Sequence, residues 1–556
     1  MATKKSSKAK VRNVWMVTRE YDRLAGAGGV KDVCRQLSET LAEKGRVRVS
    51  VVMPRYGFMD PVALGFKSML MPSPLCPAFV VGSMVDGFDV DMNYAGENRR
   101  EKVAIWKREQ KGVTVFLVEA ERFAEKLSVY TYTAQEEKLR TWQHQGMGHY
   151  DYFAMNILLQ KAALGLMLVL GERPDVIHCQ DGHAAVLPAM MREIEGYRHF
   201  FRHTGAVVTI HNAGVGYHQD IEDLHFAQAV TGLPEQVIKT GLLGSVFDPF
   251  MVAAGYAMLN TVSENYALEL RKTSEDARTG WLGHNLQQIG ANLDGITNGI
   301  NPADFDPTKP KQLGLPASFD VVKGRLAGKR TCKEILLRSL ASRRKRAKVE
   351  QFGRLTKSAD KPLITFVGRL TEQKGVDLLI NCFTTGILNG ERDFQLLVLG
   401  DGNLEMESRL SAMAESEELA GRVCFLKGYD QDLAVKIYAA GDFFLIPSLY
   451  EPCGLTDYIA QLLGNLPIVH HVGGLVKVID GQTGFAYVEH SSVALAESLT
   501  RALALYREEP NVIRKMQQKA VLQIREKHTW GKVMVRYLDI YQQAIEKACL
   551  ESSVGQ

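Results

Sequence analysis

Short apolar runs alternate with longer amphipathic stretches along most of the chain. VRNVWMV (11–17), RPDVIHC (173–179) and FQLLVLGDG (394–402) have the length and composition of buried strands, and stretches with helical spacing follow them. Strands that alternate with helices in this way form parallel sheets covered by helices. The pattern therefore predicts an α/β fold built on parallel sheets.

The alternation begins twice. A strand, a glycine turn and a helix follow one another at 11–45, and again in KPLITFVGRLTEQKGVDLLINCF (361–383). Each resembles the first strand, turn and helix of a Rossmann-like unit, and a segment rich in Gly, Asn, Asp and Pro (292–310) separates them. We therefore predict two doubly wound Rossmann-like domains with a cleft between them. The expected parts are a flexible basic tail (1–10), an N-terminal domain (11–300), a C-terminal domain (301–529) and a C-terminal helical segment (530–556).

Composition and charge narrow the class of protein. The 556 residues carry a net charge of only +4, so the bulk charge does not demand a nucleic acid as partner. The eight cysteines show no paired spacing, which is typical of reduced thiols in the cytoplasm. The longest apolar run, AALGLMLVLG (162–171), is too short to span a membrane. We expect a cytoplasmic protein with neither nucleic acid nor membrane as partner, and the sequence does not indicate its oligomeric state.

The basic run SRRKRAK (342–348) stands out locally. We interpret it as the solvated face of a helix that connects the two domains.

A glycine turn follows the first strand. RLAGAGGVKDV (23–33) places Gly28 and Gly29 at the start of a helical pattern. A glycine turn that opens a helix after a strand is typical of a phosphate-binding loop. No lysine, however, directly precedes the paired glycines.

The second half of the chain holds a more specific cluster. VGRLTEQKG supplies Arg369 and Lys374 just after a buried strand, and SLYEPCGLT supplies Glu451 followed by a helix start at 454–456. An arginine and a lysine at the carboxyl ends of parallel strands can neutralise a diphosphate, and so can the N–H groups of a helix N-terminus. A carboxylate can accept hydrogen bonds from sugar hydroxyls. The cluster therefore indicates a nucleotide-sugar site.

These segments resemble a known family. PLITFVGRLTEQKGVDLL, YAAGDFFLIPSLYEPCGLT and LPIVHHVGGL are similar to the retaining glycosyltransferases that include bacterial glycogen synthase and plant starch synthase. In the first half, VIHCQDGHAAVLPAMM is similar to that family's Asp-Trp-His segment and VVTIHNAGVGY to its Thr-Ile-His-Asn segment. The resemblance spans residues 14–541. It implies a GT-B fold, with two Rossmann-like domains and the active site in the cleft between them. It also implies that the C-terminal helical segment (530–556) crosses back to the first domain.

The same resemblance implies an activity. The family transfers glucose from ADP-glucose to the 4-hydroxyl at the non-reducing end of an α-1,4-glucan, such as glycogen or a malto-oligosaccharide, with retention. It needs no metal or other cofactor, because protein cations carry the diphosphate. The resemblance makes Arg369, Lys374, Glu451 and His211 the catalytic residues. The expected donor-binding residues are Gly28, Gly29, Asp32, Gly454, Leu455, Thr456 and Tyr429, the last as a wall for the adenine. The expected sugar and acceptor residues are Asp181, His183, Asn212, Asn298 and Cys453, with Cys453 as a small buried thiol and not a nucleophile.

The sequence departs from the family where a Lys-Thr-Gly-Gly-Leu loop is expected, because Gly26 replaces the lysine. Three accounts are open. Lys31 or Arg23 supplies the charge, the glycine backbone suffices without it, or the chain binds its ligands and turns over poorly. Gly182 replaces the tryptophan of Asp-Trp-His, which we expect to loosen that wall, and Val472 replaces a threonine. UDP-glucose or another nucleotide sugar is therefore an alternative donor, and a catalytically weak glucan-binding or regulatory paralogue is an alternative function.

Overall fold

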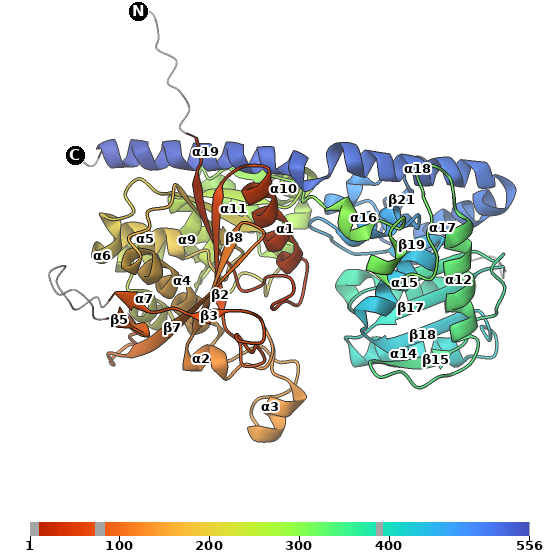
Figure 1. Ribbon diagram of the computed structural model, residues 1–556, viewed down its shortest axis with the longest axis horizontal. Helices are drawn as coiled ribbons and strands as arrows, with labels where there is room; N and C mark the ends of the chain where they lie inside the picture. The colour runs from red at the N-terminus through yellow and green to blue at the C-terminus, as the bar shows by residue number, and fades with distance from the viewer. Residues whose placement is uncertain (1–9, 73–83, 385–392, 555–556) are drawn as a thin grey trace, which may run out of the picture. The chain divides into compact units, whose positions relative to one another are not determined.

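The computed structural model describes residues 10–72, 84–384 and 393–554. They form two compact units, each with its own sheet and helices (Figure 1). All but the last residue of the expected basic tail (1–10) lies outside the described residues. Unit 1 comprises Met1–Thr297 and Trp530–Gln556, and unit 2 comprises Asn298–Thr529.

Unit 1 is built on a ten-stranded sheet in the order β14-β13-β10-β9-β1-β2-β8-β7-β3, with β6 beside β7. The strands from β14 to β8 are parallel to their neighbours, as the sequence predicted. They are almost fully buried because helices cover both faces. Their bounds are β1 (Asn13–Val17), β2 (Arg48–Pro54), β8 (Val113–Glu119), β9 (Val176–Gln180), β10 (Gly205–Ile210), β13 (Met258–Thr261) and β14 (Leu293–Gly295).

The other edge of this sheet is antiparallel, a feature that the sequence did not predict. β7 (Arg100–Gln110) runs antiparallel to β8, β3 (Lys67–Ser68) and β6 (Gly87–Asp91). Lys111 and Gly112 join β7 to β8, and both have positive φ, 50° and 76°. A two-residue turn with two positive φ values is a hairpin turn, which makes its flanking strands antiparallel.

The last helix of the chain belongs to unit 1. α19 (Trp530–Val554) packs against β10 so closely that a Cβ on Gly205 would lie 2.7 Å from the carbonyl carbon of Ala544. Tyr541 Oη lies 2.8 Å from His178 Nδ1, and Trp530 Nε1 donates to Gln36 Oε1 at 2.9 Å. α19 therefore closes one face of the unit 1 sheet (Figure 1).

The remaining helices of unit 1 surround the sheet. α4 (Tyr152–Val169) is long and apolar enough to cross a membrane by length and composition, but 78% of it is buried inside the fold, as in the core helix of a globular unit. The other helices are α1 (Val30–Glu43), α2 (Glu121–Ala124), α3 (Ala134–Leu139), α5 (Leu187–Glu193), α6 (Glu195–Arg198), α7 (Leu224–Thr231), α8 (Glu235–Thr240), α9 (Pro249–Tyr256), α10 (Glu264–Lys272) and α11 (Leu282–Gln288). Two short antiparallel strand pairs complete the unit, β4 (Met71–Pro72) with β5 (Met84–Val85) and β11 (Leu242–Leu243) with β12 (Val246–Phe247).

Unit 2 has a seven-stranded sheet in the order β15-β18-β17-β16-β19-β20-β21. Only β15, at the edge, is antiparallel to its neighbour among the strands that the structure describes. The bounds are β15 (Val349–Gly353), β16 (Leu363–Val367), β17 (Gln395–Gly400), β18 (Val423–Gly428), β19 (Phe443–Ile446), β20 (Leu466–His470) and β21 (Phe485–Tyr487).

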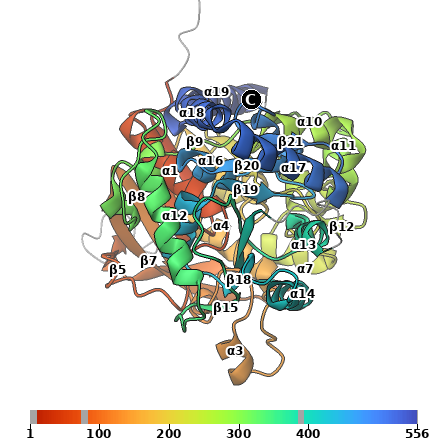
Figure 2. The ribbon, with the colours of Figure 1, turned by 90° about the vertical axis from the view of Figure 1, so that its right-hand side faces the viewer.

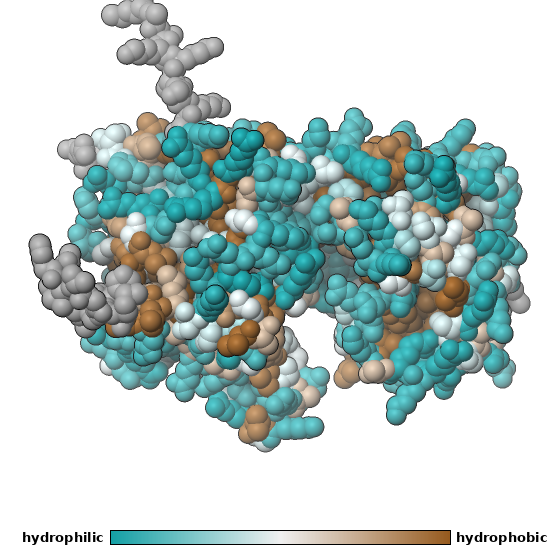
Figure 3. Space-filling view, in the orientation of Figure 1, coloured by the Kyte–Doolittle hydropathy of each residue, from teal (hydrophilic) through white to brown (hydrophobic). Residues whose placement is uncertain are grey.

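Alternate residues of the unit 2 strands enter two separate cores. Ile364 and Phe366 face α13 (Val376–Thr384), α14 (Leu404–Glu415) and α17 (Ser492–Glu508). Leu363 and Val367 face α12 (Ala327–Leu340), α15 (Gln431–Ala440) and α16 (Thr456–Leu462). Figure 2 shows α12 on one side of the strands and α13 and α14 on the other, and α18 (Pro510–Lys527) contributes to both cores. Hydrophilic residues cover most of the surface of each unit in the view of Figure 3.

The helix expected over SRRKRAK (342–348) is absent, because α12 ends at Leu340 and the run is irregular. Arg346 of this run donates to Ser339 O at 2.9 Å and to Gln351 Oε1 at 2.6 Å. The run therefore folds back between α12 and β15, and its guanidinium satisfies a carbonyl near the helix end.

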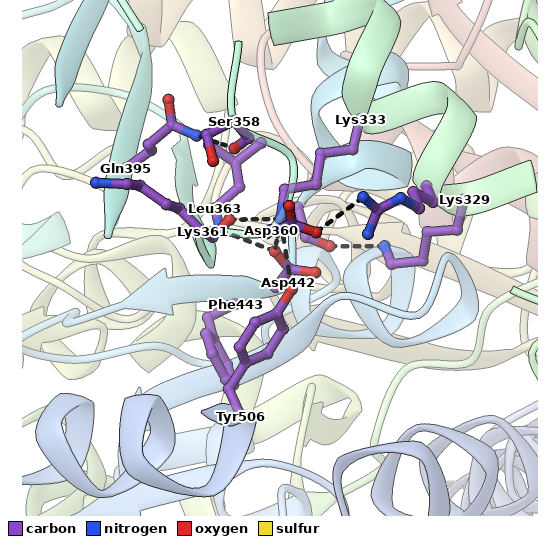
Figure 4. Close-up of polar contacts among 12 residues, drawn as sticks. Lys329, Lys333, Ser358, Asp360, Lys361, Leu363, Gln395, Asp442, Phe443 and Tyr506 are labelled. Atoms are coloured by element: carbon purple, nitrogen blue, oxygen red, sulfur yellow. Dashed lines mark hydrogen bonds and ion pairs between the residues drawn. The ribbon is translucent and has the colours of Figure 1, made fainter. Parts of the chain in front are cut away.

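Two buried lysines of α12 attach this helix to the sheet (Figure 4). Lys333 Nζ donates to Asp442 Oδ2 at 2.6 Å, and the same oxygen accepts from Leu363 N at 2.8 Å. Lys329 Nζ donates to the carbonyls of Ala439, Gly441 and Leu463 at 2.6–3.0 Å. These contacts hold the amino ends of β16 and β19, opposite the ends that carry the candidate site.

Candidate functional site

In each sheet, several candidate residues follow the strands between which the strand order reverses. In unit 1 the chain leaves β1 for β2 on one side, whereas β9 and β10 lie on the other side. In unit 2 the same reversal falls between β16 and β19. Ligands of open α/β sheets bind at such switch points, outside the carboxyl ends of the strands.

A carboxylate that sequence analysis missed, Glu20, lies just before the glycine loop of unit 1 and binds to it. Glu20 follows β1 and is 2% exposed. Its Oε2 accepts hydrogen bonds from Ala27 N at 2.8 Å and Gly28 N at 3.1 Å, and Tyr130 Oη donates to its Oε1. Two backbone N–H groups of the glycine turn, which we expected to bind phosphate, therefore already donate to the carboxylate of Glu20. A carboxylate between a buried strand and a glycine turn was the signal available in the sequence.

The start of α1 carries Asp32 and Lys31 side by side. Gly29 is the N-cap of α1, and Lys31 Nζ lies 2.6 Å from Asp32 Oδ2. Burial raises the pKa of Asp32, and Lys31 opposes this rise. A Cβ on Gly26 would lie 2.5 Å from Lys31 Cδ, so the stem of Lys31 runs directly beside the residue that replaces the family lysine. Arg23, the other cation near the loop, lies 3.8 Å from Asp22 with its side chain 58% exposed.

Asp181 and His211 lie together after β9 and β10. Asp181 has a positive φ of 63°, and its Oδ1 accepts from His211 N at 3.3 Å. Burial raises the pKa of Asp181 to about 7. His211 Nε2 lies 2.8 Å from Gln180 Oε1, and burial lowers the pKa of His211 to about 3. His211 is therefore a neutral hydrogen-bonding group at neutral pH.

Tyr130 connects His183 to the glycine loop. The rings of His183 and Tyr130 stack with their centroids 5.2 Å apart, and Tyr130 also binds Glu20. Burial lowers the pKa of His183 well below its ordinary value. Asn212 Oδ1 accepts from Gly214 N at 2.9 Å, so this side chain stabilises the loop after β10. Unit 1 thus brings its predicted residues together at one edge of its sheet, with Tyr130 as a further member.

Gly182 does not loosen the wall of this site, contrary to expectation. A Cβ at residue 182 would lie 2.2 Å from the carbonyl oxygen of His218. His218 is held by Asp248 Oδ2 at 2.6 Å and by Ala213 O at 2.7 Å. The backbone of His218 therefore occupies the space in which a tryptophan side chain at 182 would begin.

In unit 2, Lys374 and Glu451 form a close ion pair. Lys374 ends the 3₁₀ helix η4 (Glu372–Lys374) after β16, and Glu451 follows β19. Lys374 Nζ lies 2.5 Å from Glu451 Oε2, which also accepts from Ser448 Oγ at 3.1 Å. Burial opposes ionisation of Glu451, but Lys374 and Ser448 together hold its pKa below the ordinary value. The structure thus joins a cation and a carboxylate that lie 77 residues apart in the sequence.

Arg369 and Tyr429 lie on other loops at the same edge of this sheet. Arg369 follows β16 directly and is exposed, and Tyr429 follows β18 and is 55% exposed. An exposed aromatic ring beside the carboxyl ends of the strands can stack on a nucleobase.

Lys477 fixes the start of α16 and was missed by sequence analysis. It lies at the end of η5 (Gly473–Lys477), and its Nζ donates to Gly454 O at 2.8 Å and to Gly474 O at 3.0 Å. It also donates to Cys453 O and pairs with Asp457 Oδ1 at 3.3 Å. Lys477 therefore orients the segment from Cys453 to the helix start. Burial raises the pKa of the Cys453 thiol to about 11, so the thiol is protonated at neutral pH and suits a structural role better than a nucleophilic one.

The helix start itself lies where the sequence placed it, with Leu455 as the N-cap of α16 and Thr456 as its first residue. Asn298, expected in the first domain, belongs to unit 2. Its carbonyl accepts from Tyr458 Oη at 3.4 Å, which ties the incoming chain to α16. Within the described parts of the chain, no three His, Cys, Asp or Glu side chains cluster as a metal site.

Comparison with known proteins agrees with this arrangement. Residues 13–292 match the model of the starch synthase catalytic domain, and residues 348–520 match that of glycosyl transferases group 1. The glycogen synthase of Aeromonas hydrophila is 28% identical over 545 residues, which cover 96% of this chain and 98% of that protein. The glycogen synthase of Aeromonas salmonicida is 29% identical over 554 residues, with the same coverage.

Solved structures show the same fold. The catalytic domain of starch synthase IV from Arabidopsis thaliana, bound to ADP and acarbose, matches with a TM-score of 0.75 at 24% identity, over 97% of this chain and all of that one. Sucrose-phosphate synthase from Thermosynechococcus elongatus matches with a TM-score of 0.55 at 17% identity, over 96% of this chain and all of that one. Together, these structural matches and the two Rossmann-like units identify the fold as GT-B. The first family match alone covers half of the 556 residues. The chain therefore belongs to the starch synthase catalytic-domain family and is a glucosyltransferase of the glycogen and starch synthase type.

Proposed function

We propose that this chain transfers glucose from ADP-glucose to the 4-hydroxyl at the non-reducing end of an α-1,4-glucan, with retention of configuration. The family uses a nucleotide-sugar donor and a glucan acceptor. The observation that carries the proposal is the Lys374–Glu451 pair at the switch point of the unit 2 sheet. Support for an adenine nucleotide comes from starch synthase IV, which was solved with ADP.

The proposed chemistry is electrostatic. As the bond from glucose to the diphosphate breaks, negative charge grows on the departing ADP and positive charge on the sugar. Lys374 and Arg369 stabilise the former, and the ionised Glu451 stabilises the latter while it accepts hydrogen bonds from glucose hydroxyls. His211, neutral because its pKa is about 3, offers a hydrogen bond to the sugar and no charge. We propose that these protein cations, and not a metal, balance the diphosphate.

The remaining predicted residues are proposed to bind donor and acceptor. The N–H groups at the start of α16 suit a phosphate, and Tyr429 suits the base. Asp181, His183 and Asn212 suit the sugar or the acceptor. A cytoplasmic setting belongs to the same proposal, because the described cysteines, among them Cys34 and Cys453, are free.

The test is transfer of labelled glucose from ADP-glucose and, in parallel, from UDP-glucose to glycogen. We expect incorporation as α-1,4-linked glucose. Replacement of Lys374 by Met or of Glu451 by Gln should lower kcat by roughly a hundredfold to a thousandfold, the usual effect of one lost electrostatic contact to a transition state. Lys374→Met also leaves a buried carboxylate unpaired, so we include the double variant Lys374→Met/Glu451→Gln, which removes both charges.

Lys427 provides a matched control. Its Nζ lies 2.8 Å from Glu407 Oε2 in the same unit, so Lys427→Met also breaks a lysine–glutamate pair. It should leave transfer unchanged.

A preference for UDP-glucose would correct the donor and keep the reaction. Absence of transfer from both donors, in a folded chain that still binds glycogen, would replace the proposal by a glucan-binding protein, a function that the internal acceptor Glu20 in the glycine loop would then favour.

A further inference from the structure

We propose that Lys31 supplies the positive charge that the glycine loop lacks at position 26, and that its ammonium binds the diphosphate of the nucleotide-sugar donor. This inference rests on the proposed function, since it names a further donor-binding residue for the same reaction.

The first argument is spatial. A Cβ on Gly26 would lie 2.5 Å from Lys31 Cδ and 2.7 Å from Lys31 Cβ, closer than side-chain atoms pack. The stem of Lys31 therefore fills the volume in which a side chain at residue 26 would begin. A lysine side chain at residue 26 and the present side chain of Lys31 cannot occupy this volume together. The loop therefore has room for one lysine stem here, and residue 31 supplies it instead of residue 26.

The second argument concerns the backbone of the loop. Ala27 N and Gly28 N both donate to Glu20 Oε2, at 2.8 and 3.1 Å. A carboxylate already bound to these amides competes with a phosphate for them and repels it. The account in which the glycine backbone alone replaces the lost lysine is therefore weakened, and a nearby cation becomes necessary.

The third argument is that Lys31 suits this role better than Arg23. The Lys31 side chain is 30% exposed and lies against the loop, with its Nζ 2.6 Å from Asp32 Oδ2. An ammonium has three N–H donors on a flexible stem, so it can hold Asp32 and a phosphate oxygen together. The Arg23 side chain is 58% exposed beside Asp22, and it is not among the atoms nearest to Gly26. Space for an anion exists at the loop, because a Cβ on Gly28 would meet no described atom within 4 Å.

The experiment measures binding of ADP and AMP, and of UDP and UMP, to the full chain by calorimetry. Lys31→Met keeps a stem beside Gly26 and removes the charge. We expect it to weaken ADP binding by roughly tenfold to a hundredfold, the range for a lost charge-assisted hydrogen bond. The loss for AMP, which has a single phosphate, should be at least tenfold smaller. Thermal unfolding of each variant checks that it is folded.

The decisive variant moves the lysine to the other position. Gly26→Lys alone should damage the loop, because the new Cβ meets the Lys31 stem. Gly26→Lys/Lys31→Gly removes the clash with the Lys31 stem and returns the charge. The new Cβ still lies 2.9 Å from Glu20 Oε2, so the Glu20 side chain must shift by a few tenths of an ångström. ADP binding should recover to within about threefold of the wild type, an energy difference below 1 kcal/mol. Lys111→Met is the control, since Lys111 Nζ also pairs with a carboxylate of α1, Glu39, at 3.0 Å. It should leave binding unchanged.

The outcomes separate this inference from the proposed function. If Lys31→Met binds ADP as the wild type does, in a chain that transfers glucose, the inference is overturned and the proposed function stands. If Lys31→Met loses binding and the folded double variant does not regain it, a lysine at position 26 cannot replace the ammonium of Lys31, and the account in which the two positions serve one phosphate site is overturned. If the wild type neither binds a nucleoside diphosphate nor transfers glucose, both fall.

Discussion

Carboxylates of similar burial behave differently in this chain because their partners differ. Glu451 lies against the ammonium of Lys374, which holds its pKa below the ordinary value in spite of burial. Asp181 accepts hydrogen bonds from backbone N–H groups, but burial outweighs them and, together with the nearby charge of Glu20, raises its pKa to about 7. Glu451 is therefore ionised throughout the neutral range, whereas Asp181 changes its charge within it.

This difference predicts a pH-dependent stability that depends on Asp181. The pKa of Asp181 is about 7 in the folded chain against an ordinary 3.8, so its contribution to stability is fully present below about pH 4 and is lost as the pH rises to about 7. The stability of the wild type relative to Asp181→Asn should fall by about 1.4 kcal/mol per pH unit across this window, or about 4 kcal/mol in total. Chemical denaturation of both proteins at several pH values measures it. A difference that stays constant with pH would show that Asp181 is ionised throughout.

At the level of elements, the turn after β20 packs directly against the backbone of Glu451 and requires glycine there. Gly473 begins η5 with a φ of +52°, and a Cβ there would lie 2.0 Å from the carbonyl oxygen of Glu451. The next residue, Gly474, donates its N–H to that oxygen at 2.9 Å. The turn therefore passes directly against the backbone of the candidate catalytic segment, and only glycine leaves room for it.

Two glycine substitutions separate crowding from backbone strain. Gly481 also has a positive φ, +65°, but a Cβ there would meet no described atom within 4 Å. Gly481→Ala should therefore cost only the left-handed conformation, about 1 to 2 kcal/mol of unfolding free energy. Gly473→Ala should cost a further 1 to 3 kcal/mol, roughly, for the clash, and it should lower glucose transfer as well. Urea unfolding and the transfer assay measure the two effects. Equal losses in both variants would show that the turn after β20 can relax.

The elements also show what a sequence can predict here. Central parallel strands such as β9 and β16 were predictable, because strands buried on both faces are continuous apolar runs. The antiparallel edge at β7 was not, because its direction depends on the turn at Lys111 and Gly112. The sequence predicts a solvated helix face over 342–348, whereas the contacts of Arg346 hold this run in an irregular conformation.

The residues of the candidate site also fall into two groups, those that the sequence predicted and those that it did not. The residues after central strands, such as Lys374 and Glu451, could be named from their order in the chain, and their roles stay predictions. Glu20 and Lys477 were missed because their partners become visible only in the folded chain, although the position of Glu20 between a strand and a glycine turn was a signal in the sequence. Tyr130 reaches Glu20 across 110 residues, and Lys477 reaches Cys453 across 24. No periodicity or local motif encodes pairings of this length.

At the level of the whole molecule, unit 2 interrupts the chain of unit 1. Unit 1 is complete only when α19 is added after residue 529. The buried face of α19 is a helical stripe that includes Trp530, Tyr537, Tyr541 and Ala544. Tyr541 reaches the buried His178, so the C-terminal helix is part of the unit 1 core.

Removal of α19 should therefore affect one unit and not the other. A chain that ends at Thr529 should lose the unfolding transition of unit 1 in calorimetry and keep that of unit 2, because the apolar face of the unit 1 sheet is then uncovered. A chain that ends at Leu550 retains the stripe and should keep both transitions. Two intact transitions in the shorter chain would show that unit 1 does not depend on α19.

The position of α19 also affects how the protein is made. A ribosome that has finished the ten strands of the unit 1 sheet must add about 230 further residues, those of unit 2, before the helix that covers this sheet emerges. At about 5 to 20 residues per second this takes roughly 12 to 46 seconds. During that interval the nascent chain presents an open apolar face at β10 while unit 2 is still being synthesised. The order of segments thus leaves this face without its covering helix until unit 2 has been made.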